Sequence, residues 1–347
     1  MTQTRIAVAG AGLIGQAHMA VIQRNPACQL GAIVDPSPAA VALAQRAGVP
    51  LYPTLEALLA QDRPDGIILA TPNPLHVPQA LQCIAAGLPI LLEKPIATTV
   101  AEGRQLVDAV ARSGARVLIG HHRAHSPIMA KARQLVESGQ LGRLVAVMGS
   151  ATFFKPDHYF DDGPWRRESG GGPILINLIH EIHNLRMLGG DIVAVQAFKS
   201  HAARGFAVED TAAINLRFAS GMLGSFMLSD SAACARSWEQ TSRENPAYAS
   251  YDDEDCYVIS GTLGSLSVPT MRLKTYPSAQ ASSWWKPFEV GTVGLVREDP
   301  LSRQMAHFIA VVRGQAQPLV TARDGLENLR VTEAIARAAE SGQVVEL

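Results

Sequence analysis

The chain has 347 residues, of which 47% are apolar and 18% charged, and a formal net charge of −1. This length favours two domains, and the composition is typical of a soluble globular protein. The near-neutral charge argues against nucleic acid as a partner. No apolar run reaches the roughly 18 residues of a membrane span, and the four cysteines are scattered like reduced thiols. We therefore expect a cytoplasmic protein without a membrane partner.

The first predicted elements are a strand at 5–9, a glycine turn, and a helix at 13–24. The turn reads Gly10-Ala-Gly12-Leu13-Ile14-Gly15, and Asp35 ends a second apolar run twenty residues later. This is the fingerprint of dinucleotide binding: the glycines allow a tight turn and close approach of a pyrophosphate, which the helix N-terminus then holds. Asp35 is suited to accept from ribose hydroxyls, and Pro36 rather than Arg follows it. The pattern predicts NAD in preference to NADP.

Short apolar strands continue to alternate with helical segments through the first 120 residues. The further predicted strands are 30–34, 66–70, 89–92 and 116–119, and the helices are 38–47, 74–86, 98–113 and one that begins near 127. Thr54 and Asn73 resemble N-caps, and Gly48, Gly87 and Gly114 resemble helix stops. This alternation predicts an α/β Rossmann domain with a doubly wound parallel sheet over residues 1–122. The turn 10–15, segment 70–76, which contains 71–76, and Glu93-Lys94-Pro95 should meet at its ligand-binding edge.

From about residue 143 the apolar pattern changes to strict alternation. Ile214, Leu216 and Phe218 alternate with polar residues, and a turn at 219–221 leads into 222–228, which predicts a hairpin. Further strands are predicted at 143–153, 192–199, 256–260, 264–268 and 288–296, helices at 174–188, 300–313 and 322–341, and a long loop at 236–255. We expect an α+β domain over residues 123–347 with a large, mostly antiparallel open sheet.

Five motifs follow one another in chain order: the glycine turn, Thr71-Pro72-Asn73-Pro-Leu-His76, Glu93-Lys94-Pro95, Gly120-His-His-Arg-Ala-His-Ser-Pro127, and Gly170-Gly-Gly172 with His180 eight residues later. With them the chain resembles, over essentially its whole length, the glucose-fructose oxidoreductase/inositol dehydrogenase/rhizopine-catabolism family. The resemblance implies hydride exchange between a nicotinamide and a hydroxyl carbon of a sugar or cyclitol. It also implies a second domain whose sheet packs subunits together, so that we expect a homodimer or homotetramer.

Lys94 is the first candidate catalytic residue, because it ends a buried strand at the ligand edge. Its ammonium can bind a substrate oxygen and stabilise alkoxide character as hydride leaves, and Glu93 could orient it. The other interpretation is a surface lysine at a strand end.

His180 is the second candidate, with Asn177 beside it. On a helix, Asn177, His180 and Asn184 share one face, and His183 lies next to them. An imidazole with an ordinary pKa of about 6.5 suits proton transfer, and the resemblance implies this role for His180. Many relatives carry Asp where this chain has Ile176, and a second Asp where it has His183. Whether this changes the proton route is left open.

The complete set of predicted site residues combines these loops. The predicted cofactor-binding residues are Gly10, Gly12, Leu13, Ile14, Gly15, Asp35, Thr71, Pro72, Asn73, His76, Glu93, Lys94, Trp165 and Arg166. The predicted substrate-binding residues are Lys94, His122, Arg123, Asn177, His180 and His183. No metal site is predicted, since the spacing of His180 and His183 is not that of the zinc protease helix. His121, His125, Trp284 and Trp285 receive no role.

These residues predict an NAD-dependent dehydrogenase that acts on a secondary hydroxyl of a sugar, polyol or cyclitol, a small polar substrate. One alternative is reduction of a C=C, imine or dihydrodiol-type substrate on the same scaffold. The other is a dinucleotide-binding regulator without catalysis. Retention of both Lys94 and His180 argues against the regulator.

Overall fold

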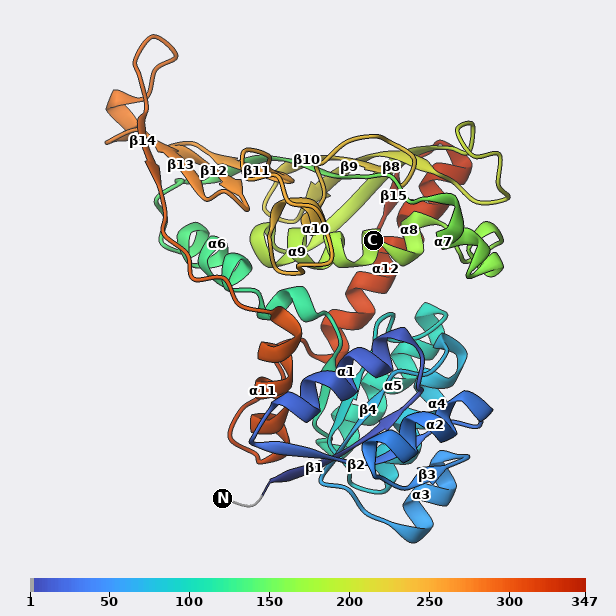
Figure 1. Cartoon of the computed structure of the whole chain (residues 1–347). Coiled ribbons are helices and arrows are strands. Elements are labelled where there is room, and N and C mark those ends of the chain that lie inside the picture. The colour runs from blue at the N-terminus through green and yellow to red at the C-terminus, as the bar shows by residue number, and fades with distance from the viewer. Residues whose placement is uncertain (1–2) are drawn as a thin grey trace. The chain divides into compact units, whose positions relative to one another are not determined.

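The structure is a computed structural model that describes residues 3–347 and divides into two compact units (Figure 1). The first unit runs to His125 and includes Pro300–Leu329, and the second comprises Ser126–Asp299 and Arg330–Leu347. The expected boundary at 122/123 lies close to the end of the first segment. The return of helix α11 (Pro300–Val312) to the first unit has no signal in the sequence pattern, which placed residues 123–347 together.

The first unit is built on a six-stranded sheet in the order β3-β2-β1-β4-β5-β6, with every neighbouring pair parallel. This confirms the predicted Rossmann fold, and Ile6, Val8 and Ile33 are fully buried in it. The strands are β1 (Thr4–Ala9), β2 (Cys28–Val34), β3 (Leu51–Tyr52), β4 (Gly66–Leu69), β5 (Ile90–Leu92) and β6 (Val117–Ile119). The helices are α1 (Leu13–Arg24), α2 (Pro38–Ala47), α3 (Leu55–Gln61), α4 (His76–Ala85) and α5 (Val100–Ser113), with 3-10 turns η1 (Asn73–Leu75) and η2 (His122–His125).

The predicted helix boundaries of this unit are largely confirmed. Gly48, Gly87 and Gly114 follow helices with φ of 65°, 70° and 66°, the left-handed conformation that glycine adopts without strain. Thr54 caps α3 by accepting from the N–H of Ala57. Asn73 is not an N-cap, because η1 begins there and precedes α4. The short elements β3 and α3 were not predicted.

The second unit contains a nine-stranded sheet in the order β14-β13-β12-β11-β7-β10-β9-β8-β15. All neighbouring pairs are antiparallel except β7 and β10, so the predicted mostly antiparallel sheet is confirmed. The strands are β7 (Leu144–Thr152), β8 (Ile192–Ser200), β9 (Thr211–Phe218), β10 (Leu223–Ser229), β11 (Tyr257–Gly261), β12 (Gly264–Val268), β13 (Arg272–Thr275), β14 (Glu289–Thr292) and β15 (Val345–Glu346).

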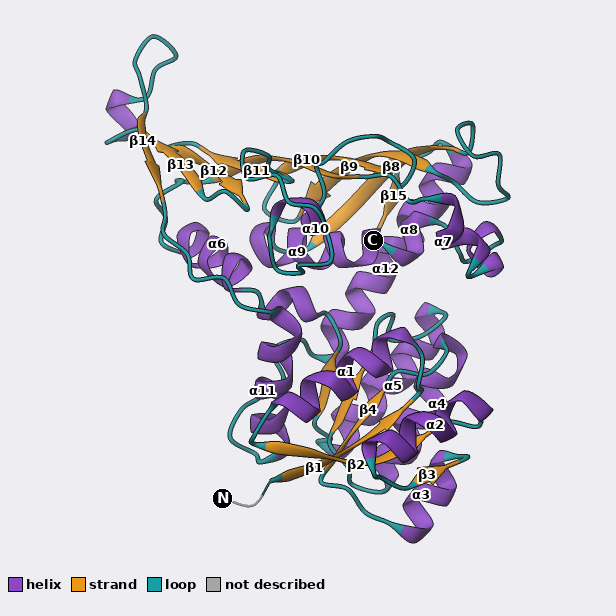
Figure 2. Ribbon diagram, in the orientation of Figure 1, coloured by secondary structure: helices purple, strands orange, loops and turns teal. Residues whose placement is uncertain are grey.

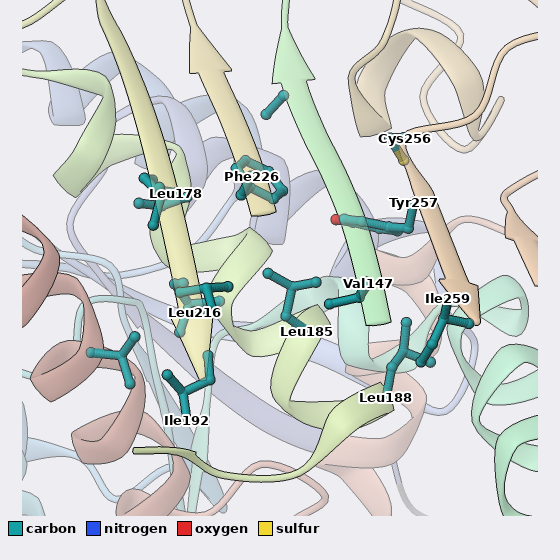
Figure 3. Packing of buried hydrophobic residues seen from close by; sticks show 14 of the residues in the cluster. Val147, Leu178, Leu185, Leu188, Ile192, Leu216, Phe226, Cys256, Tyr257 and Ile259 are labelled. Carbon is teal, nitrogen blue, oxygen red and sulfur yellow. The ribbon is translucent and has the colours of Figure 1, made fainter. Parts of the chain in front are cut away.

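Helices cover one face of this sheet in Figures 1 and 2. They are α6 (Pro127–Glu137), α7 (Asp157–Asp161), α8 (Pro173–Ile176), α9 (Leu178–Gly189), α10 (Trp238–Thr241) and the second part of α12 (Ala322–Ser341), with the 3-10 turn η3 (Pro164–Arg167). The 3-10 turn η4 (Ala279–Ala281) lies apart from them, in the segment between β13 and β14. Figure 3 shows the core between α9 and the sheet, where Leu185 lies near Val147 and Leu216. This packing fixes α9, which carries His180, against the strands.

Three predictions for the second unit need correction. The helix expected at 174–188 is two helices, α8 and α9, which meet at Asn177. The loop expected at 236–255 contains α10, and the strand expected at 288–296 is limited to β14. Among the helices of residues 3–347, none combines the length and the apolar character needed to cross a membrane.

Candidate active site

The glycine turn between β1 and α1 has the shape that a dinucleotide needs. A Cβ at Gly10 would lie 2.3 Å from the carbonyl oxygen of Ala70, and one at Gly15 would lie 1.9 Å from that of Gly10. A Cβ at Gly12 would meet nothing within 4 Å, so glycine there leaves open space in front of the helix. No side chain among the described residues caps α1, and its first-turn N–H groups can bind an anion. The turn therefore fits a pyrophosphate.

Asp35 follows β2 and reaches back to this turn. Its Oδ2 accepts from the N–H of Ala11 at 2.7 Å, and its Oδ1 accepts from the N–H of Ser37 at 2.8 Å. Burial alone would raise the pKa of Asp35, but the hydrogen bonds from Ser37 and Ala11 outweigh it and hold that pKa below its ordinary value. Asp35 is therefore a fixed carboxylate beside the dinucleotide turn.

Lys94 follows β5 at the same sheet edge. Within the described stretch 88–97 it alone is not buried. The strand register places β5 beside β4, and β4 beside β1, so the loops after all three strands lie next to one another. The predicted meeting of the glycine turn, segment 71–76 and Glu93-Lys94-Pro95 is thus what the topology produces.

Glu93 lies behind Lys94 rather than facing the ligand edge. It is 5% exposed, and its Oε1 lies 2.8 Å from Nε2 of His18, a fully buried residue of α1. A Cβ at Gly120 would lie 2.8 Å from its carboxyl group, so glycine is needed to admit it. Burial favours a raised pKa, but His18, Lys94 and His122 together hold the pKa of Glu93 below its ordinary value. The buried pair ties the dinucleotide helix to the loop of Lys94.

His76 joins the other two loops of this edge. It is 1% exposed, with Nδ1 2.7 Å from the carbonyl oxygen of Pro95 and Nε2 2.9 Å from that of Thr71. Burial is the main influence on the pKa of His76 and lowers it. Both ring nitrogens face the protein backbone, so His76 braces the loops after β4 and β5.

In the second unit, the helix α9 carries His180 and His183, which are 9% and 5% exposed. Asn184 follows His180 by four residues on the same helix, but its side chain points into the core. Asn184 is fully buried and donates to the hydroxyl of Tyr257, which in turn donates to Glu181. The inward side of α9 therefore carries a buried polar network that anchors the helix to β11.

Asn177 is held by a residue that the sequence analysis did not identify. Nζ of Lys155, just beyond β7, donates to Oδ1 of Asn177 at 2.8 Å and lies 3.4 Å from Asp230, just beyond β10. Arg204 binds the other oxygen of Asp230 at 3.1 Å. Burial lowers the pKa of Lys155, and Asp230 opposes this shift. A polar residue after each of two neighbouring parallel strands could have signalled this cluster.

Of the remaining predicted residues, Trp165 and Arg166 belong to the second unit and His122 and Arg123 to the first. Trp165 is 55% exposed, and the guanidinium of Arg166 lies 3.9 Å from the ring centroid of Tyr159. Arg123 is buried and His122 half-buried within the first unit. The other histidines of that segment pack internally, since His121 contacts Asn328 and Nε2 of His125 lies 2.8 Å from Nδ1 of His307.

The site residues thus form two sets. The first unit holds the glycine turn, Asp35, segment 71–76 and Lys94, and the second holds Trp165, Arg166, Asn177, His180 and His183. Within residues 3–347, no three histidine, cysteine, aspartate or glutamate side chains gather in a way that could hold a metal ion.

Two family models match the chain. Residues 4–121 match the oxidoreductase family with an NAD-binding Rossmann fold, and residues 129–267 match the GFO/IDH/MocA C-terminal domain. The chain belongs to this oxidoreductase family. The resemblance drawn from the motifs is confirmed, as is the two-part fold.

Relatives with assigned activities cover most of the chain. The chain is 28% identical to a 1,5-anhydro-D-fructose reductase of Ensifer adhaerens, over 85% of this chain and 83% of that protein. It is 25% identical to an inositol 2-dehydrogenase of Rubrobacter xylanophilus, over 97% and 91%. Among solved structures, the WlbA dehydrogenase of Bordetella pertussis, in complex with NADH and UDP-GlcNAcA, is 25% identical with a TM-score of 0.78, over 100% and 99% of the two chains.

Proposed function

We propose that this oxidoreductase is an NAD-dependent dehydrogenase that acts on a secondary hydroxyl of a sugar, polyol or cyclitol. The observation that carries the proposal is the placement of Lys94. It is the one residue of stretch 88–97 that is not buried, and it stands at the sheet edge that also holds the dinucleotide turn. The relatives named as D-apiose and inositol dehydrogenases support the substrate class.

Lys94 would bind the substrate oxygen and stabilise the negative charge that develops on it. His180 would accept the hydroxyl proton in oxidation and return it in reduction. Asn177 would bind substrate but cannot take a proton, because its amide does not titrate. The nicotinamide, when bound, supplies the hydride acceptor for this chemistry.

Two differences in role follow from the geometry. Glu93 and His76, predicted to contact cofactor, direct their polar atoms to His18 and to backbone carbonyls. We assign both to positioning of the loops around Lys94. Cofactor contacts would come from the glycine turn, Asp35, the backbone of segment 71–76, Trp165 and Arg166.

The experiment is a panel of sugars, polyols and cyclitols with NAD, followed by NADH absorbance, on the wild type and on Lys94→Met. Methionine keeps the length of the side chain and removes its charge. We expect Lys94→Met to lose more than tenfold in turnover, about 1.4 kcal/mol of barrier stabilisation, with NAD binding retained.

Turnover above a tenth of the wild-type value would remove Lys94 from its proposed role. A second panel of enones and imines is assayed with NADH as the hydride donor. Turnover there, with no alcohol oxidised by NAD, would favour the reductase alternative. NAD binding without turnover of either class would favour the regulator.

A further inference from the structure

Lys155, Asn177 and Asp230 form a cluster whose hydrogen-bond donors and acceptors indicate what the second unit binds. A lysine ammonium can only donate, so the atom of Asn177 that faces it must be the amide oxygen. The amide NH2 of Asn177 is then directed away from Lys155. It makes no hydrogen bond within residues 3–347 and is not sealed from solvent.

Lys155 also has donor capacity to spare. Lys155 is only 9% exposed, and its ammonium lies 4.9 Å from the ring centroid of Tyr159. Two of its three N–H groups are used by Asn177 and Asp230. The third has no acceptor in the part of the chain that the structure describes. The third N–H of Lys155 and the amide NH2 of Asn177 are therefore neighbouring donors without an acceptor among the described residues.

The carboxylate nearest to Lys155 is engaged by a cation on each of its oxygens. Asp230 faces two cations, Lys155 and Arg204, with one oxygen to each. Asp210 is occupied by two backbone N–H groups and the hydroxyl of Thr211. A ligand hydroxyl bound to Lys155 and Asn177 would have to direct its own proton elsewhere, whereas an oxyanion only accepts.

We propose that Lys155 and Asn177 form an oxyanion-binding subsite, which selects substrates that carry a carboxylate or a phosphate group. The subsite lies at the start of α9, one turn before His180. Its place beside the reacting hydroxyl rests on the proposed function, whereas binding of the anion does not.

The test measures binding by isothermal titration calorimetry on the full chain with saturating NADH at neutral pH. The probes are two matched sets: D-glucose, D-glucuronate and D-glucose 6-phosphate, and D-galactose, D-galacturonate and D-galactose 6-phosphate. We expect at least one anion to bind ten times more tightly than its neutral parent. Whether it is the uronate or the phosphate identifies the source of the oxyanion.

Lys155→Met should weaken binding of that anion by about 10- to 100-fold, since it removes a charge-assisted hydrogen bond. Asn177→Asp keeps the size of the side chain and replaces the donor with an acceptor, so it should remove the preference for the anion. It decides the question even if Lys155→Met does not fold. The matched control is Lys199→Met, a lysine of β8 paired with Glu340, which should bind like the wild type.

Equal binding of both anions and their neutral parents in both sets would overturn the proposal. So would an anion preference that survives Asn177→Asp. Anion binding without turnover of any alcohol would leave the subsite standing and contradict the proposed reaction. Turnover of neutral sugars without any anion preference would support the proposed reaction and contradict the subsite.

Discussion

Asp35 is the residue through which the first unit can select its dinucleotide. Its carboxylate is fixed by the N–H groups of Ala11 and Ser37, and its lowered pKa keeps it charged at neutral pH. A charged carboxylate accepts from a ribose 2′-hydroxyl and repels a 2′-phosphate. We therefore expect the wild type to bind NAD at least tenfold more tightly than NADP.

The double variant Asp35→Ser, Pro36→Arg should reverse this preference, because it removes the negative charge and adds a phosphate-binding guanidinium. Calorimetric titration of both cofactors measures it, with Asp108→Ser on the exposed side of α5 as the control. Tighter binding of NADP by the wild type would refute the role of Asp35.

Single residues differ in how far the sequence could identify them. Gly10 and Gly15 were predictable because their neighbours in the motif determine the turn, and Lys94 because it ends an apolar run. Lys155 was not, because its partners Asn177 and Asp230 lie 22 and 75 residues away and meet it only once β7 and β10 pair in parallel. The burial of Asn184 was not predictable for a related reason: helical spacing gives a face but not what that face packs against.

At the scale of elements, the pair of His18 and Glu93 links α1 to the loop of Lys94. Glu93 has a lowered pKa in the folded protein, because His18, Lys94 and His122 outweigh its burial. Such a carboxyl stabilises the fold above its unfolded pKa of about 4.3 and loses this contribution as the pH falls through the folded pKa. Part of the acid sensitivity of the first unit should therefore depend on Glu93.

Glu93→Gln keeps an oxygen for His18 and removes the titration. At pH 7 we expect this variant to be less stable than the wild type by about 1 kcal/mol or more, since a hydrogen bond to a charged group becomes neutral. The difference should shrink as the pH falls through the folded pKa of Glu93, because the wild-type carboxyl is then protonated too. Urea unfolding at pH 7 and at a series of lower pH values measures it, with Asp108→Asn as the control. A difference independent of pH would contradict the lowered pKa.

The elements that the sequence did not predict are those whose limits depend on tertiary contacts. The break between α8 and α9 falls at Asn177, whose side chain is bound by Lys155 rather than exposed on a continuous helix. The strand β14 lies at the edge of its sheet with every residue exposed, so its apolar pattern indicates no buried face. Periodicity predicts α11 as a helix but cannot say which unit it packs on.

At the scale of the whole molecule, one face of the nine-stranded sheet is not covered by helices, and we call it the uncovered face. Figure 2 shows the helices of the second unit on the opposite face. On the uncovered face, Phe198, Ala213, Met227 and Ser150 lie in one row across four strands, and Met148 lies opposite Ser225 in the next. Phe198 is 66% exposed and Met148 59%. An exposed row of apolar and small side chains across four strands usually marks an interface.

We propose that this face joins two copies of the chain, as a homodimer or as half of a homotetramer. Light scattering at micromolar concentration should then give a multiple of the 37.0 kDa chain mass. The double variant Met148→Asp, Met227→Asp should shift the protein to the monomer, because each copy would bring two like charges into the interface, four in the dimer. Val41→Asp provides the control, since Val41 is an equally exposed apolar residue on α2 of the first unit. A wild type that stays monomeric at this concentration would refute the proposal.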